Sequence, residues 1–264
     1  MKNLFLIFIS ASVLFFVLAG CTLNRPKQNA LSHARLMNKI TVGVKNDSKP
    51  FGFIDENGEP AGFDVDVARE IARQILGDEN AVEFVFVTPQ SRISDLNSKK
   101  ADMVIAAMSI TPARSGVVSF SAPYYEAGQA IMVKSGSDIA SLNDLNGANV
   151  GFVLGTTGER TIRHLAPAAS LRAAKTYPEI FNLLKNNEIE AILADDSMLY
   201  GLVSENIGYK ILPKRYTKEY YAVALRRTPE SEELREAVNA AINVMSQRGI
   251  LNKIKSKWIP PLHS

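Results

Sequence analysis

Cysteine, histidine and tryptophan are scarce in this chain of 264 residues, which has one cysteine, three histidines and one tryptophan. A lone cysteine excludes a disulfide within the chain. His33, His164 and His263 lie far apart in the sequence and near no acidic cluster, so we expect no metal site. The sequence also has no glycine-rich phosphate loop that ends in lysine, and we expect no cofactor.

An excess of one charge is also missing. The chain has 30 basic and 27 acidic residues, which gives a formal net charge of +3 spread along its length. Without a basic tract or a patch of interleaved aromatic residues, nucleic acid is not an expected partner. A content of 46% hydrophobic and 22% charged residues is typical of a globular protein, and the length is sufficient for two medium domains.

The N-terminal hydrophobic run is too short to cross a membrane. It extends from Leu4 to Leu18, whereas a spanning helix needs about 20 residues. The run leads into Leu-Ala-Gly-Cys21, which resembles a bacterial lipoprotein signal. We therefore expect a signal peptide over residues 1–20, a lipid on the Cys21 sulfur, and a polar tether over residues 21–38. The alternative is an ordinary signal peptide in which the cysteine is incidental.

From residue 39 onward, segments rich in β-branched residues alternate with segments of helical periodicity. The expected strands cover residues 40–46, 82–87, 102–107, 150–154, 189–194 and 220–226. The expected helices cover residues 64–76, 91–100, 178–187, 197–205 and 229–258. Asp64 and Thr111 are the expected N-caps of two helices, and Gly249 is an expected break in the last one. This alternation predicts α/β domains with largely parallel sheets.

Six short segments, each weak alone, occur in an order and spacing that together are specific. They are Val42-Gly-Val-Lys-Asn-Asp47, Pro50-Phe-Gly-Phe53, Gly62-Phe-Asp-Val-Asp-Val67, Ser109-Ile-Thr-Pro-Ala-Arg114, Phe120-Ser-Ala-Pro-Tyr-Tyr125 and Gly155-Thr-Thr157. In this order the chain resembles the polar amino-acid-binding proteins of ABC importers. The resemblance implies a type II periplasmic-binding-protein fold, with two doubly wound α/β lobes joined by two hinge strands. Lobe 1 would be residues 39–130 plus 223–264, and lobe 2 residues 131–222.

The resemblance also implies how a free amino acid would be held in the cleft between the lobes. Arg114 carries a planar guanidinium that can grip a carboxylate with two hydrogen bonds, and it matches the arginine that binds the α-carboxylate. Asp195 follows a predicted strand, at the edge where open α/β sheets bind ligands, and matches the ammonium-binding acid. Asp196 is the neighbouring alternative. Further candidates for contact with the ligand are Ser109, Ala107, Gly155, Thr156, Thr157, Phe51 and Tyr177.

Two further cations occupy motif positions, Lys45 in the first of these segments and Arg92 in Thr88-Pro-Gln-Ser-Arg-Ile93. Together with Arg114 and Asp195 they give the cleft an expected charge of +2, which a glutamate ligand would reduce to +1. We therefore expect a ligand-binding protein, without enzymatic activity, for glutamate or aspartate. Glutamine or another polar neutral amino acid is the alternative ligand, and a dehydratase-like enzyme on the same fold is the alternative class.

The remaining expectations concern location and partners. The lipid on Cys21 would anchor the protein to a bacterial membrane outside the cytoplasm, at the cell surface or on the periplasmic side. There the protein would act as a monomer that delivers its amino acid to the permease of an ABC importer.

Overall fold

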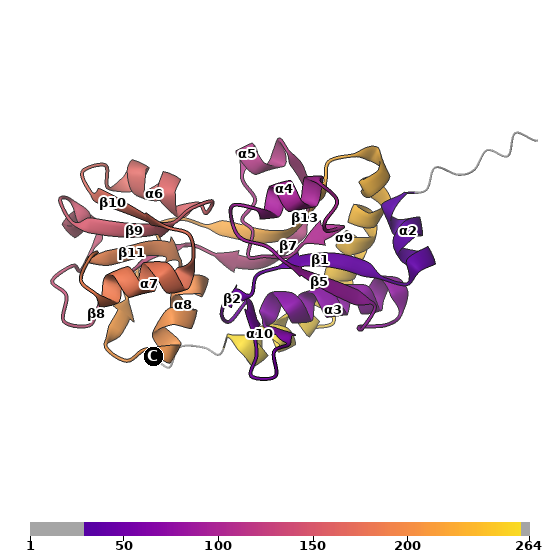
Figure 1. Cartoon of the computed structure of the whole chain (residues 1–264), viewed down its shortest axis with the longest axis horizontal. Coiled ribbons are helices and arrows are strands. Elements are labelled where there is room, and N and C mark those ends of the chain that lie inside the picture. The colour runs from indigo at the N-terminus through magenta and orange to yellow at the C-terminus, as the bar shows by residue number, and fades with distance from the viewer. Residues whose placement is uncertain (1–28, 260–264) are drawn as a thin grey trace, which may run out of the picture.

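The structure is a computed structural model that describes residues 29–259, and its strands form two large sheets in two lobes (Figure 1). The first sheet has the order β5 (Val82–Phe86), β1 (Ile40–Val44), β6 (Met103–Val104), β13 (Glu219–Arg226) and β7 (Val118–Ala127). The second has the order β10 (Ser170–Ala174), β9 (Asn149–Val153), β11 (Ala191–Asp195), β8 (Gln129–Lys134) and β12 (Tyr209–Ile211). A small third sheet consists of β2 (Asp47–Ser48), β3 (Gly52–Ile54) and β4 (Pro60–Ala61).

Helices lie beside both large sheets (Figure 1). The first lobe carries α2 (Ala30–Met37), α3 (Phe63–Leu76), α4 (Arg92–Asn97), α5 (Pro112–Ser115), the 3₁₀ turn η2 (Pro229–Ser231), α9 (Glu232–Gln247) and α10 (Ile250–Trp258). The second lobe carries η1 (Leu142–Leu145), α6 (Gly158–Leu165), α7 (Tyr177–Lys185) and α8 (Asp196–Glu205). None of these helices within residues 29–259 is long and apolar enough to cross a membrane. The expected signal peptide and Cys21 lie outside the described residues.

The predicted alternation of strands and helices is confirmed, and so are several helix ends. Strand β1 pairs in parallel with β5 and β6, as βαβ connections require. The Thr111 hydroxyl accepts a hydrogen bond from Arg114 N at 3.2 Å and caps α5. Gly249 has a φ of 69° and separates α9 from α10. Strand β7 was not predicted. Its Pro123 argues against a strand, and the irregular register of β7 with β13 around Ala222 accommodates the proline.

The chain passes between the lobes twice. Strand β7 belongs to the first sheet and β8, which starts at Gln129, to the second, so the first crossing is at Gly128. The second crossing lies between Ile211, in the second sheet, and Glu219, which pairs with Ala127 in the first. Both crossings come earlier in the sequence than the expected lobe limits of 130/131 and 222/223.

The segment expected to be a tether is helical over its last part. Helix α2 is capped by Asn29, whose side chain accepts from Ser32 N at 2.7 Å, and ends at Asn38 in the left-handed conformation. Leu31 and Ala34 are buried against the first lobe. The expectation was wrong from residue 30 onward because these two apolar residues, three positions apart, are too few to show a helical period in the sequence.

Candidate functional site

A narrow cavity lies between the lobes. Its lining comprises Lys45, Pro89, Arg92, Ala107, Ser109, Arg114, Thr156, Thr157, Tyr177, Asp195 and Met198. All the residues expected to contact a ligand are therefore brought together here except Phe51 and Gly155. The polar and charged lining suits a small charged metabolite.

Arg114 reaches from the first lobe to the second. The cap on α5 sets the direction of its side chain, and the guanidinium donates from Nη1 to Ser109 O at 2.8 Å and from Nη2 to Gly155 O at 3.0 Å. A guanidinium has five N–H donors, so these two bonds leave donors for a ligand carboxylate. Gly155 does not line the cavity, yet its carbonyl is the acceptor that links the lobes at this point.

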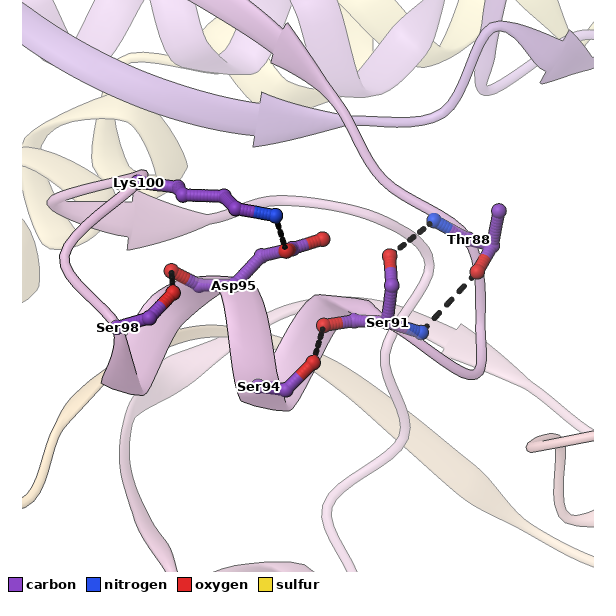
Figure 2. A network of polar contacts seen from close by, with 6 residues as sticks. All are labelled: Thr88, Ser91, Ser94, Asp95, Ser98 and Lys100. Carbon is purple, nitrogen blue, oxygen red and sulfur yellow. Dashed lines mark hydrogen bonds and ion pairs between the residues drawn. The ribbon is translucent and has the colours of Figure 1, made fainter.

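Arg92 lies in the first turn of α4, and polar contacts hold that turn in place. Figure 2 shows Ser91 and Thr88 exchanging two hydrogen bonds, from Thr88 N to Ser91 Oγ at 3.1 Å and from Ser91 N to Thr88 Oγ1 at 3.0 Å. Further along the same helix, Lys100 Nζ donates to Asp95 Oδ1 at 2.6 Å (Figure 2). These contacts lock the start and the end of a helix that has fewer than two turns.

The Arg92 side chain is buried and makes a second link between the lobes. Its Nη1 donates to Ala106 O at 2.8 Å and its Nη2 to Gly155 O at 3.3 Å. Its Nε is one of two buried side-chain polar atoms without a hydrogen-bond partner in the described part of the chain. Burial, with the nearby charge of Arg114, lowers the pKa of Arg92 to about 9.

Asp195 stands at the end of β11, as predicted, and each of its carboxylate oxygens accepts a hydrogen bond from a crossing strand. Gln129 Nε2 donates to Oδ1, and the Tyr221 hydroxyl donates to Oδ2. Burial, and then the negative charge of Glu219, raise the pKa of Asp195 to about 7. Asp196, the alternative, instead accepts from Gly128 N at 3.1 Å and pairs with an arginine outside the cavity.

Three polar residues that sequence reasoning missed extend this network. Gln129 Nε2 also donates to Thr157 Oγ1 at 3.0 Å, and Thr157 Oγ1 donates to Glu219 Oε2 at 2.8 Å. Gln129 and Tyr221 are fully buried, and Glu219 is partly buried. A glutamine within the apolar run of β8 is the one signal in the sequence that could have indicated a buried polar function for Gln129.

Asp64 does not cap α3 as expected, because Gly62 occupies the N-cap position. Asp64 is buried instead, where it accepts from Ala107 N and from the Tyr124 hydroxyl, both at 2.8 Å. The bond to Ala107 N holds this residue at a φ of 45°, a left-handed conformation that is uncommon for alanine. Burial raises the pKa of Asp64 to about 7.

Lys45 and the two aromatic candidates occupy different surroundings. Lys45 Nζ lies 4.4 Å from the centroid of the Tyr177 ring, and both residues are buried in the cavity wall. Burial lowers the pKa of Lys45 to about 8. Phe51 lies away from the cavity lining, in an aromatic cluster with Tyr125 and Tyr221. Packing in the core therefore describes Phe51 better than contact with a ligand.

The charges around the cavity differ from the count made on the sequence. The cations are Lys45, Arg92 and Arg114, and the carboxylates that act on them are Asp47, Asp64, Asp195 and Glu219. Three positive and four negative groups give a formal charge of −1 when all are ionised. The sequence count of +2 omitted three of these carboxylates, Asp47, Asp64 and Glu219. Within residues 29–259, no cluster of histidine, cysteine and acidic side chains could hold a metal ion.

The two-lobed arrangement and the intervening polar cavity define a ligand-binding protein of the type II periplasmic-binding-protein fold. Residues 40–261 match the bacterial extracellular solute-binding proteins, family 3, and the chain belongs to this family. It is 35% identical over 269 residues to the ABC transporter glutamine-binding protein GlnH of Bacillus subtilis (strain 168), with 98% of each chain covered.

Two further similar proteins are also described in connection with glutamine. The chain is 37% identical over 197 residues to the glutamine-binding protein of Geobacillus stearothermophilus, which covers 74% of this chain and 75% of that one. Among solved structures, an ancestral arginine-binding protein bound to glutamine superimposes with a TM-score of 0.78 at 39% identity, covering 85% of this chain and 99% of that one.

Proposed function

We propose that this protein captures L-glutamine outside the cytoplasm and delivers it to the permease of an ABC amino-acid importer. The observation that carries the choice of ligand is that the three cations of the cavity already have carboxylates near them: Asp47 and Asp64 act on Lys45, and Asp195 and Glu219 act on Arg114. Glutamine is a zwitterion without side-chain charge, so its burial leaves the charge of the site unchanged. Glutamate would add a further negative charge, and an uncompensated buried charge is costly.

The proposed pose uses one charged group for each end of the amino acid. The α-carboxylate lies against the Arg114 donors that Ser109 O and Gly155 O leave free, and the ammonium lies against Asp195. Both contacts replace water lost on closure with charged hydrogen bonds, which contribute about 1.5–3 kcal/mol each. Because Arg114 belongs to the first lobe and Asp195 to the second, the ligand would hold the lobes together.

The side-chain amide would lie toward Lys45 and Arg92. An amide oxygen can accept from the unpaired Arg92 Nε and from Lys45 Nζ, whereas the amide nitrogen needs an acceptor. Asp64 acts electrostatically on both cations, so it balances them before a ligand arrives. With this arrangement, the side chain of the ligand needs to form hydrogen bonds with Lys45 and Arg92, but it does not need to carry a charge.

Glutamate or aspartate is the second candidate, and one observation favours it. No carboxylate of residues 29–259 lies within ion-pair distance of Lys45 Nζ, and the buried Arg92 Nε has no partner. A side-chain carboxylate could bind both. The names of the two curated relatives above favour glutamine instead.

Isothermal titration of the soluble domain at pH 7.5 with L-glutamine, L-glutamate, L-aspartate and L-arginine tests the choice. We expect glutamine to bind at least about tenfold more tightly than glutamate, a difference of about 1.4 kcal/mol. A wild type that prefers glutamate would overturn it. The Lys45→Met variant adds a second comparison, since loss of this cation should weaken the binding of glutamate more than the binding of glutamine. Arg160→Ala, at an exposed arginine of the second lobe, is the matched control for loss of a cation.

The proposal includes the expected location and organisation of the chain. We propose cleavage before Cys21, a lipid anchor on its sulfur, a monomeric state, and rotation of two lobes about Gly128 and the segment between Ile211 and Glu219. A dehydratase-like activity remains the alternative class. It would be detected as release of water from a cyclic amino-acid-like substrate, and glutamine recovered unchanged from the protein would count against it.

A further inference from the structure

Glycine stands in the middle of α8, at Gly201, where it is a poor choice for the helix. Glycine is among the weakest helix formers because it loses the most backbone freedom on folding. Gly201 is helical, and its φ is not positive, so the turn itself does not require glycine. The reason for a glycine here must therefore come from the space around it.

That space is occupied by the backbone of the other lobe. A Cβ atom on Gly201 would overlap with Lys49 O, and it would lie 2.7 Å from the Lys49 carbonyl carbon and 3.1 Å from Pro50 Cδ. Carbon atoms attract each other best at about 3.5–4.0 Å, so these distances are strongly repulsive. The obstacle is backbone, which cannot move aside as the end of a flexible side chain could. A methyl group at this position is incompatible with the lobes as they lie here.

The same contact continues one turn further along α8. Glu205 Oε1 accepts from Lys49 Nζ at 2.7 Å, so Lys49 meets the second lobe both with its backbone and with its side chain. Lys49 lies between β2 and β3 of the first lobe, close to Lys45 in the cavity wall. The glycine thus sits at a close contact between the backbones of the two lobes.

We propose that Gly201 is a positioning residue for ligand binding, which sets how far the two lobes can close. It touches no ligand in the proposed pose and acts by letting α8 approach the Lys49 backbone. Gly155 makes a similar approach to Pro89 O, at 2.7 Å from its Cβ position, but its φ of 75° gives it a second reason to be glycine. At Gly201 the close approach of the Lys49 backbone is the one reason found for glycine, so a substitution there tests the effect of that approach by itself.

This role predicts effects of opposite sign on stability and on affinity. In the open form α8 is free of Lys49, so Gly201→Ala improves the helix and should raise the melting temperature of the ligand-free protein by about 2–4 °C. In the closed form the added methyl group must push the lobes apart, so the affinity should fall by about 10–100-fold. A residue needed only for folding would lower both quantities.

The test uses the full soluble domain and, as the probe, whichever of the twenty L-amino acids raises the wild-type melting temperature most. Melting temperature without ligand, affinity by calorimetry and the radius of gyration at saturating ligand are measured for Gly201→Ala. His164→Ala is the matched control, because this exposed residue lies in helix α6 of the same lobe and should gain helix stability with affinity unchanged within about twofold. Lys49→Ala removes the exposed ion pair with Glu205 and the contact of Lys49 Nζ with the Phe53 ring but keeps the backbone at this position, and it should change the affinity by less than about fivefold.

The proposal is supported if Gly201→Ala is more stable without ligand, binds more weakly and stays more expanded with ligand than the wild type. An affinity within twofold of the wild type would overturn it, and so would a fall in the melting temperature of the ligand-free variant. The inference rests on the proposed function only in needing a ligand that closes the lobes. If the amino acid that stabilises the wild type most is not glutamine, only the proposal of glutamine as the ligand is contradicted. If the wild type binds no amino acid, the proposed function and the role of Gly201 are both overturned.

Discussion

Replacement of Asp195 by asparagine should weaken ligand binding and stabilise the ligand-free protein. The change keeps the shape of the side chain, and an amide oxygen can still accept from the Tyr221 hydroxyl. It removes the negative charge that we propose to pair with the ligand ammonium. Loss of a charged hydrogen bond costs about 1.5–3 kcal/mol, which corresponds to a roughly 10–150-fold weaker affinity at pH 7.5.

The stability of the ligand-free protein should change in the other direction. Burial and the charge of Glu219 raise the pKa of Asp195 from 3.8 to about 7. The hydrogen bond from Tyr221 and the charge of Arg114 lower this pKa, but their effect is smaller. Between these two pH values the folded state binds more protons than the unfolded state, so stability falls as the pH rises through this window. Above pH 7, the ionised Asp195 lowers the free energy of unfolding by the full effect of about 4 kcal/mol, and Asp195→Asn removes this penalty.

The same titration makes ligand binding depend on pH. Binding of an ammonium needs the ionised carboxylate, so the affinity of the wild type should fall roughly 25-fold between pH 7.5 and 5.5 if the ligand holds Asp195 ionised. The groups that face this carboxyl are Glu219, Asp196, Arg114 and Tyr221.

Calorimetry across this pH range and urea unfolding at pH 8 measure these effects. In the Asp195→Asn variant the affinity should be weak at pH 7.5, and its pH dependence should be nearly flat. A variant that binds as tightly as the wild type, or that is less stable than the wild type at pH 8, would refute the reasoning. Glu219→Gln is the matched control for the second carboxylate. It should keep the pH dependence while moving its midpoint to lower pH.

Three further predictions concern single residues. Thr111→Ala removes the cap of α5 and should lower the free energy of unfolding by about 1 kcal/mol, with a several-fold weaker affinity because Arg114 is less fixed. Leu31→Ala should cost about 2–3 kcal/mol in urea unfolding if α2 is part of the folded lobe, and nothing if residues 30–37 act as a tether. Cys21→Ser should remove the protein from the membrane fraction, and an unmodified Cys21 in the mass spectrum of the native protein would contradict the lipid anchor.

The elements that sequence reasoning found were those whose signals are local. The cap at Thr111, the break at Gly249 and the buried strand that ends at Asp195 all depend on a few neighbouring residues. Strand β7 and helix α2 were missed, since a proline and a short apolar pattern conceal them. Both acquire their structure from contacts with distant parts of the chain, above all the pairing of β7 with β13.

The residues of the candidate site also fall into two groups, those with a local signal in the sequence and those that only the fold brings to the site. Lys45, Arg92, Arg114 and Asp195 were found through short segments, whereas their partners come from elsewhere in the fold. Asp64 was assigned to a helix cap because its position in the sequence suits one, and only the tertiary structure brings it to Ala107 N. The error in the charge count has the same cause: Asp47 and Asp64 lie in the quoted segments, but only the folded chain shows that they act on Lys45.

The most direct test of the account is a crystal structure of the soluble domain grown with L-glutamine. The account predicts one amino acid in the cavity between the lobes, with its α-carboxylate against the Arg114 guanidinium and its ammonium against Asp195. It also predicts Gly201 in contact with the Lys49 backbone in that closed form. Glutamine bound in the reverse orientation, or bound outside this cavity, would contradict the central claim.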